Sequence, residues 1–327
     1  MTLVKKSEGI YIDDSCIDLL EKTNIVIFDC DGVLIDITKS YDLAIIKTTQ
    51  YVLENFTKIN NSLTVDFKII DGFKSTGGFN DEVDLTYSAI ISLVAANQLE
   101  KDPTEFIFDV INNSDSSGII SVEKYLESQT DISKIKNQLS YPGTHHQNPL
   151  YQIFDQLFYG PKLYENLFKI KSNFSESGLI EQDDVILNEK LLKLLQTKFD
   201  SKIAMVTGRG KQSVKYSLKE MLDEFDLNNS VFLEDESREL AKPNPQPLFD
   251  SIKGMGDGIT LYVGDSMEDF IMAKKVTDMG SKVIFCGIIG TSKNPQEKFE
   301  LFQQNEAVLV LDSINLLPKV LNLEYTK

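Results

Sequence analysis

Five short apolar runs constrain the fold of this chain more than any other feature of its sequence. The first is 25–29 (IVIFD), and the others come late, at 202–207, 259–265, 281–286 and 306–311. Helical patterns separate the late runs, because their apolar residues recur at a period of about 3.6. Buried parallel strands are apolar throughout and alternate with helices. The order therefore predicts a Rossmann-like doubly wound α/β domain with a parallel sheet.

The long segment after the first run has a different character. Between about 38 and 187, strand-like runs nearly vanish and amphipathic helical stripes take over. Only the run at 25–29 precedes this segment, so we expect the α/β domain to be discontinuous in sequence. A chain of 327 residues is long enough for two domains. We therefore expect a catalytic core of residues 1–37 and 188–327, interrupted by a mainly helical cap domain at 38–187.

Charge and composition argue against several classes of partner. The formal net charge of −17 would repel nucleic-acid phosphates and anionic lipid, so we expect neither nucleic acid nor a membrane. No apolar run approaches the ~18 residues that span a bilayer, and residues 1–22 lack the apolar region of a secretory signal. We therefore expect a cytoplasmic protein, for which a homodimer is one possible assembly. Cys16, Cys30 and Cys286 lack CxxC spacing and are expected to be buried small hydrophobic residues.

Reactive side chains follow three of the apolar runs. Asp29 and Asp31 end the first run, Thr207 ends the second, and Asp265 ends the third. Ligands of open α/β sheets bind at the carboxyl ends of the strands, so these residues are expected to share one edge. Side chains two apart on an extended segment point the same way, which lets Asp29 and Asp31 divide the roles of nucleophile and acid/base. Asp265 would add the hard oxygen ligand that Mg²⁺ prefers.

Four segments resemble the signature motifs of the haloacid dehalogenase-like (HAD) superfamily, in its phosphatase branch. They are VIFDCDGVLID, MVTGR, AKPNPQPLF and YVGDSMEDF, and they occur in the family's order. The insertion after the first motif lies where the branch with a helical cap, similar to phosphoglycolate phosphatases, places that cap. The residues that match the motifs are Asp29 and Asp31, Thr207, Lys242, and Asp265 with Asp269.

The resemblance implies a phosphatase mechanism with a covalent intermediate. Asp29 would attack phosphorus and form an aspartyl-phosphate, while Asp31 would protonate the leaving oxygen and then activate water. Lys242 would neutralise charge at the phosphoryl group. Thr207 would hold a phosphate oxygen, with Gly208 beside it in contact with the same group. The expected substrate is a small phosphorylated metabolite.

The resemblance also implies a magnesium site. Mg²⁺ would be held by the Asp29 carboxylate, the Asp31 backbone carbonyl and Asp265. Asp269 would be either a further ligand or a support for the others, and its position in the first turn of a helix also fits a structural role. Gly32 would let the backbone approach the phosphate closely.

The segment 72–87 (GFKSTGGFNDEVDLTY) is the most individual part of the insertion. One interpretation is a turn between helices, in which Asn80 or Asp81 caps the next helix. The other is a loop that selects the substrate, in which Gly78, Phe79 and Asn80 would contact the leaving group. The two interpretations are compatible.

Other activities and residues receive weaker support. A phosphomutase of the β-phosphoglucomutase type shares all four motifs, and a catalytically silent binding protein would keep the fold. Dehalogenases do not need Asp31 or Mg²⁺, and phosphonatases lack an aspartate at that position, so both are disfavoured. We expect Arg209 to be structural or peripheral, because the family does not require it. His145 and His146 are expected to be solvated or to cap a helix.

Overall fold

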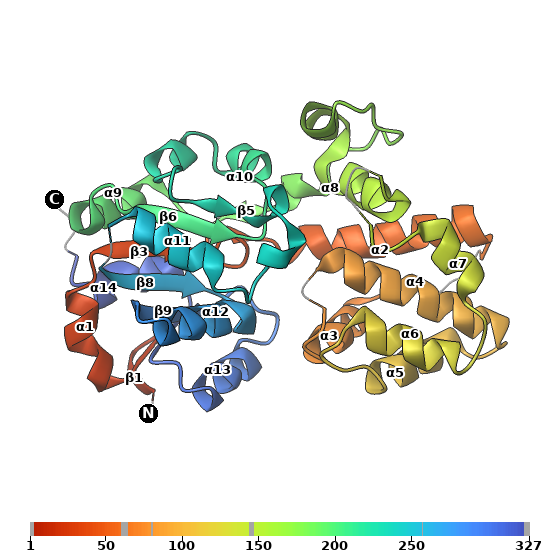
Figure 1. Ribbon diagram of the computed structural model, residues 1–327, viewed down its shortest axis with the longest axis horizontal. Helices are drawn as coiled ribbons and strands as arrows, with labels where there is room; N and C mark the ends of the chain where they lie inside the picture. Colours follow the sequence, from red (N-terminus) through yellow and green to blue (C-terminus); the bar gives the residue numbers. More distant parts are fainter. Residues whose placement is uncertain (1–2, 60–64, 80, 144–146, 257, 324–327) are drawn as a thin grey trace. The chain divides into compact units, whose positions relative to one another are not determined.

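The computed structural model describes two compact units (Figure 1). The α/β unit comprises Met1–Thr38 and Asp183–Lys327, and the helical unit comprises Lys39–Gln182. Within these limits the structure describes every residue except 1–2, 60–64, 80, 144–146, 257 and 324–327.

An eight-stranded sheet forms the centre of the α/β unit in the described part of the chain, with the order β1-β2-β10-β9-β8-β3-β6-β7. The strands from β10 to β7 in this order are parallel to one another. Each of the five apolar runs supplies one of them, so the predicted strands and the Rossmann-like fold are confirmed. The strands are β1 (Val4–Ser7), β2 (Ile10–Ile12), β3 (Ile25–Phe28), β6 (Ile203–Thr207), β7 (Val231–Phe232), β8 (Ile259–Gly264), β9 (Lys282–Ile288) and β10 (Leu309–Leu311).

The expectation that a single strand precedes the insertion was wrong. Strands β1 and β2 form a hairpin, and β2 pairs antiparallel to β10 at the edge of the sheet. All four residues of β1 are exposed, so this strand forms by pairing and leaves no apolar pattern in the sequence. A short strand β4 (Ile35–Asp36) also precedes the insertion and pairs antiparallel to β5 (Asp184–Val185), where the chain returns.

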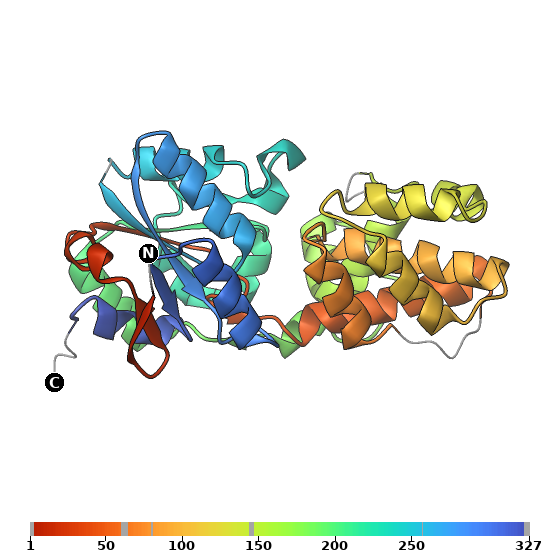
Figure 2. The same ribbon diagram turned by 90° about the horizontal axis from the view of Figure 1, so that it is seen from below.

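Helices cover both faces of the sheet (Figure 1; Figure 2). Side chains of β3 alternate between the two resulting cores: Val26 and Phe28 lie in one, and Ile25 and Ile27 lie in the other. All four are fully buried, as a central parallel strand requires. The first core is covered by α1 (Ile17–Glu21), α9 (Glu189–Phe199), α10 (Lys211–Leu218) and α14 (Leu317–Val320), and the second by α11 (Gln246–Gly254), α12 (Met267–Asp278) and α13 (Pro295–Gln304).

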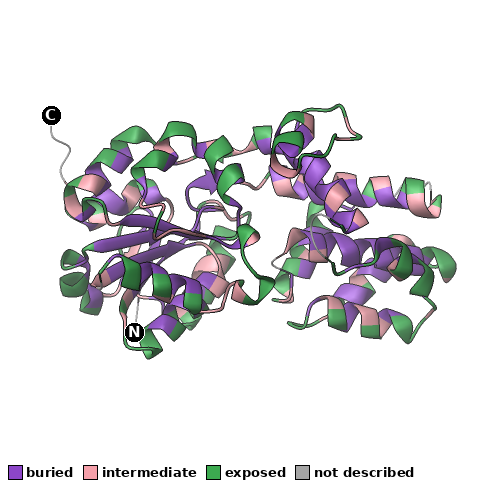
Figure 3. Cartoon of the chain, turned by 45° about the horizontal axis from the view of Figure 1, so that its top comes forward, coloured by how far each residue is buried: buried purple, intermediate pink, exposed green. Residues whose placement is uncertain are grey.

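The inserted unit is helical, as predicted. Most residues of its central helix α4 are buried, and Figure 3 shows the buried faces of the surrounding helices. Aspartate or asparagine side chains cap the first turns of α3, α4, α5 and α8. Among the described helices, none is both long enough and apolar enough to cross a membrane. The helices of the unit are α2 (Ser40–Val52), α3 (Phe67–Ser75), α4 (Glu82–Gln98), α5 (Pro103–Asn112), α6 (Ile119–Glu127), α7 (Ser133–Leu139) and α8 (Pro149–Phe168).

Candidate active site

Three adjacent parallel strands bring the predicted site residues to one edge of the sheet. Strand β3 lies between β8 and β6, and its residues pair in register with both. Asp29 follows β3, Asp265 follows β8, and Thr207 is the last residue of β6. The carboxyl end of a parallel sheet is where α/β proteins bind ligands.

Lys242 joins two of the aspartates at this edge. Its ammonium lies 2.7 Å from Oδ1 of Asp29 and 2.7 Å from Oδ1 of Asp269, and none of the three side chains is more than 9% exposed. Although burial alone would lower the pKa of Lys242, the carboxylates of Asp269 and Asp29 raise it above its usual range. Lys242 therefore stays charged and provides a fixed cation beside Asp29.

Asp29 ionises less readily than an ordinary aspartate, chiefly because it is buried. Burial raises the pKa of Asp29 to about 8; Asp269 and Asp265 also raise it, and Lys242 opposes them. A carboxylate in this position is favoured by any further cation that binds beside it. The site therefore has the electrostatic character of a cation-binding site before any ion is considered.

Both side-chain oxygens of Asp269 are in contact with donor groups of the α/β unit. Its Oδ1 accepts a hydrogen bond from the Tyr262 hydroxyl at 2.6 Å in addition to the Lys242 contact. Its Oδ2 accepts from the Ser266 hydroxyl at 2.7 Å and from the backbone N–H groups of Asp265 and Ser266. Ser266 and Asp269 form a capping box at the start of α12. Because both oxygens are engaged, the contacts favour the supporting role for Asp269 over direct ligation.

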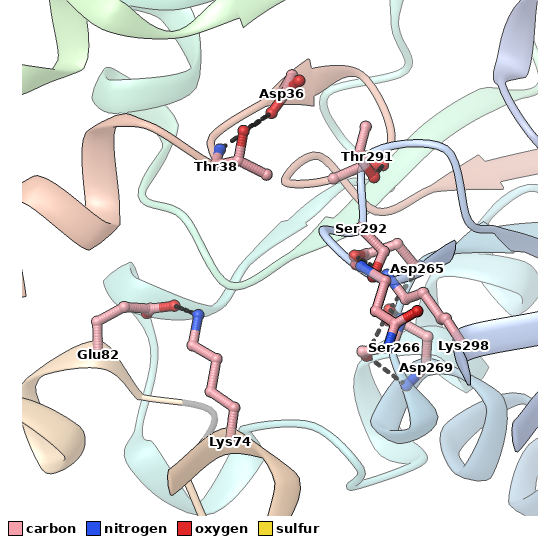
Figure 4. A network of polar contacts seen from close by, with 12 residues as sticks. Asp36, Thr38, Lys74, Glu82, Asp265, Ser266, Asp269, Thr291, Ser292 and Lys298 are labelled. Atoms are coloured by element: carbon pink, nitrogen blue, oxygen red, sulfur yellow. Dashed lines mark hydrogen bonds and ion pairs between the residues drawn. The ribbon is translucent and has the colours of Figure 1, made fainter. Parts of the chain in front are cut away.

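Asp265 completes a group of acidic side chains that could hold a metal ion. One oxygen from each of Asp29, Asp265 and Asp269 lies within 4.8 Å of the others. Gly32 has a positive φ of 70°, and a Cβ there would lie 2.3 Å from Oδ2 of Asp265, so only glycine leaves room for this carboxylate. Lys298, from α13, contacts the same Oδ2 at 2.6 Å (Figure 4). Hard carboxylate oxygens in a crowded, glycine-lined position fit a divalent cation such as Mg²⁺.

Arg209 fits the structural and not the peripheral one of its two expected roles. It is buried, and its Nε lies 2.5 Å from Oδ1 of Asp31. Its Nη2 lies 2.7 Å from Oδ2 of Asp183. Loss of hydration raises the pKa of Asp31 to about 6; Arg209 lowers it and Asp183 raises it. The family's motifs do not include Asp183, and only the arginine beside Thr207 offered a signal.

Two backbone positions after β6 differ in the room that they leave for an anion: Gly208 and the N-terminus of α10. Glu234 and Asp235 accept hydrogen bonds from the backbone N–H groups of Gly210 and Lys211, each at 2.8 Å, so the N-terminus of α10 already has acidic partners. Gly208 is exposed, and nothing lies within 4 Å of the position a Cβ would take. The backbone therefore leaves room for an anion at Gly208, whereas Thr207 is fully buried and the start of α10 already has carboxylate partners.

The glycine-containing loop of the helical unit is packed as a turn. Phe79 is buried in the core of that unit, and its ring meets Phe73 edge-on at a centroid distance of 5.0 Å. A Cβ on Gly78 would lie 2.5 Å from the backbone nitrogen of Gly118, so two loops approach closely there. These contacts give Gly78 and Phe79 structural roles and do not support substrate contact by the Phe79 ring.

Other parts of this loop act as helix boundaries. Asp81 caps α4 by accepting a hydrogen bond from the Val83 N–H at 2.8 Å, as one interpretation expected. Lys74 and Glu82 form an ion pair at 3.5 Å across the loop (Figure 4). Asn80, His145 and His146 lie outside the described residues.

Replacement of Phe79 tests this structural role. Phe79→Leu is expected to lower the free energy of unfolding of the helical unit by about 1–2 kcal/mol, because the smaller side chain leaves a gap against Phe73. Phe67→Leu, at a ring that is 50% exposed, should change it by less than about 0.5 kcal/mol. Urea unfolding followed by circular dichroism compares the two variants. Equal effects would show that the Phe79 ring does not stabilise the unit.

Two solved structures share the fold of most of this chain. One is the phosphatase Tt82 from Thermococcus thioreducens, with a TM-score of 0.59 and 20% identity over 85% of this chain and 98% of that one. The other is described as a "predicted phosphoglycolate phosphatase" from Haemophilus somnus 129pt, with a TM-score of 0.50 and 17% identity over 91% of this chain and 97% of that one. No family model matches the sequence, and no curated relative was found for it. At this identity the likeness establishes the fold, and the activity has to be argued from the side chains.

Proposed function

We propose that this chain, which has the fold of the haloacid dehalogenase-like phosphatases, hydrolyses small phosphomonoesters through an aspartyl-phosphate on Asp29. One observation carries the proposal. Asp29 ends the central strand β3, contacts the Lys242 ammonium at 2.7 Å, and lies with Asp265 in a group of carboxylates that could hold a metal ion. A carboxylate, a fixed cation and a cation site at one strand end are the parts that phosphoryl transfer needs.

The reaction would proceed in two displacements at phosphorus. In the first, a carboxylate oxygen of Asp29 forms a bond to phosphorus as the bond to the leaving oxygen breaks, and Asp31 gives its proton to that oxygen. In the second, a water oxygen attacks phosphorus, its proton passes to Asp31, and the bond from phosphorus to Asp29 breaks. Inorganic phosphate and an alcohol are released, and both aspartates return to their starting states. Thr207 and Gly208 would hold a phosphoryl oxygen throughout.

Mg²⁺ fits the carboxylate group, with Asp29 and Asp265 as side-chain ligands and the backbone carbonyl of Asp31 as a third. When bound, it would offset the negative charge of the phosphoryl group. Asp269 would not ligate the ion; it would hold Lys242 toward Asp29 and fix the start of α12.

Lys298 should compete with the metal ion for Asp265. Lys298→Met removes the ammonium that lies 2.6 Å from Oδ2 of Asp265, so we expect Mg²⁺ affinity to rise on the order of tenfold. Isothermal titration calorimetry with Mg²⁺, at one pH and one ionic strength, measures this without turnover. Lys274→Met, at an exposed lysine of the same unit, controls for the change in net charge. Unchanged or weaker affinity in Lys298→Met alone would contradict the competition.

Phosphate release from a panel of phosphomonoesters, with and without Mg²⁺, tests the proposed function. We expect Mg²⁺-dependent release from p-nitrophenyl phosphate and faster release from at least one metabolite. Isomerisation of a sugar phosphate that outpaces phosphate release would favour a mutase. Absence of turnover across the panel by folded, Mg²⁺-loaded protein would favour a silent binding protein.

A further inference from the structure

Two ion pairs of Arg209 link Asp31, the proposed acid/base, to Asp183, where the polypeptide returns from the inserted unit. Nε of Arg209 lies 2.5 Å from Oδ1 of Asp31, and Nη2 lies 2.7 Å from Oδ2 of Asp183. The side chains of Arg209 and Asp183 are 1% and 2% exposed, whereas that of Asp31 is 23% exposed. The least buried of these three side chains is therefore that of the aspartate proposed to transfer protons.

Local structure fixes the position of each of these three residues. Asp31 lies in the turn between β3 and β4, and Asp183 directly precedes β5, the strand that pairs with β4. Arg209 follows β6, its backbone N–H donates to the Thr207 hydroxyl at 3.3 Å, and its Nη1 donates to the Ser217 hydroxyl at 3.2 Å. The guanidinium is a rigid planar fork, so partners on Nη1 and Nη2 determine where its Nε points.

The arrangement does more than neutralise a buried arginine. Asp183 already supplies one carboxylate for the one positive charge, and it is as deeply buried as Arg209. The second carboxylate, Asp31, adds a negative charge that the neutrality of the pair does not require. Its contact with Nε engages Oδ1, which leaves Oδ2 as the oxygen that can carry and transfer a proton.

We propose that Arg209 and Asp183 are positioning residues for the acid/base step: Asp183 holds the Arg209 fork, and Arg209 holds Asp31 so that its other oxygen reaches the leaving group. This inference rests on the proposed function. Neither residue touches the substrate, and both act through the orientation of one carboxyl group. A misplaced general acid loses most where the leaving oxygen needs its proton most.

Leaving-group dependence is the property that a merely structural role would not change. A series of substituted phenyl phosphates, from p-nitrophenyl to p-methoxyphenyl, increases the need for protonation while the phosphoryl group stays the same. For Asp183→Asn and Arg209→Lys we expect kcat/KM to fall about 10- to 100-fold for p-methoxyphenyl phosphate. For p-nitrophenyl phosphate we expect a loss of less than about threefold. Asp184→Asn, at the exposed neighbouring aspartate, should leave the whole series unchanged.

A double variant keeps the test valid if the single variants unfold. Asp183→Leu combined with Arg209→Met removes both buried charges together, which proteins tolerate better than the loss of one. It should show the same steeper leaving-group dependence. Equal losses across the series in the folded double variant, with a steep dependence in Asp31→Asn, would overturn the positioning role alone. If Asp31→Asn lowered kcat/KM by the same factor across the series, the acid/base assignment would be overturned, and this inference with it.

Discussion

Asp29→Asn is expected to lower kcat by roughly 10⁴-fold or more for every phosphomonoester, the largest loss of any single substitution considered. An amide oxygen is a poor nucleophile, so the bond to phosphorus cannot form at a useful rate. Lys242 keeps its contact with Asp269 at 2.7 Å, so the buried ammonium retains one carboxylate partner and the fold should persist. Phosphate release in steady state and in single turnover measures the effect.

Two controls show whether the loss of activity comes from unfolding or from a change in net charge. The unfolding midpoint should remain within a few degrees of the wild-type value, and Asp278→Asn, at an exposed aspartate of α12, should keep full activity. Turnover by folded Asp29→Asn within tenfold of wild type would remove Asp29 from the nucleophile's role.

Lys242→Met should produce the second-largest loss, about 10²- to 10³-fold in kcat. The ammonium contacts Asp29, so it lies where negative charge on the phosphoryl group develops. Its charge acts on the phosphoryl group itself, so the loss should be similar for p-nitrophenyl and p-methoxyphenyl phosphate. This distinguishes Lys242 from Asp31, Arg209 and Asp183, whose variants should depend on the leaving group. A strong dependence in Lys242→Met would contradict its assignment.

The same variant should also change the pH dependence of stability. Lys242 lowers the pKa of Asp29 against burial, Asp269 and Asp265, so its removal raises that pKa further above about 8. A carboxyl group whose pKa is higher in the folded than in the unfolded state binds more protons when folded, so stability falls as pH rises above the unfolded value of about 4. Wild-type Asp29 is also protonated below pH 8, so the two proteins differ only where wild-type Asp29 ionises, and Lys242→Met should be more stable to urea near pH 7 than near pH 9, relative to wild type. A parallel shift at both pH values would exclude this linkage.

The fold could be predicted from the sequence where burial leaves a pattern. Runs such as 25–29 are apolar because the central strands are covered on both faces, and this directly indicates a parallel sheet. Strand β1 carries no such pattern, because its exposed residues are held by pairing with β2. The helical insertion was also evident, but the β4–β5 pair beside it consists of strands too short to show a period.

From the residues alone, the candidate site was predictable only where a residue's type and strand position both indicated chemistry. Asp29 and Asp265 satisfied that condition, whereas Lys242 was indicated only by its match to a motif of the resembled family, and the structure brings the three together. Asp183 did not satisfy the condition, because it lies 26 residues before Arg209 and an isolated aspartate in a loop usually faces water.

Phe79 lies in a loop for which the sequence left two interpretations open. An apolar side chain after two glycines can face a ligand or a core, and periodicity cannot separate the two in a loop. The contact between the Phe79 and Phe73 rings decides for the core.

The central claim is that Asp29 becomes phosphorylated during turnover, and residue mapping of the acid-quenched enzyme tests it most directly. Wild-type protein would be mixed with Mg²⁺ and p-nitrophenyl phosphate, quenched in acid within milliseconds, reduced with borohydride, and analysed by peptide mass spectrometry. Borohydride converts an aspartyl-phosphate to an alcohol and leaves free carboxylates intact. We expect that conversion at residue 29, only with substrate present, and its absence in Asp29→Asn. Conversion at another residue, or none in wild type while a burst of p-nitrophenol is observed, would contradict the account.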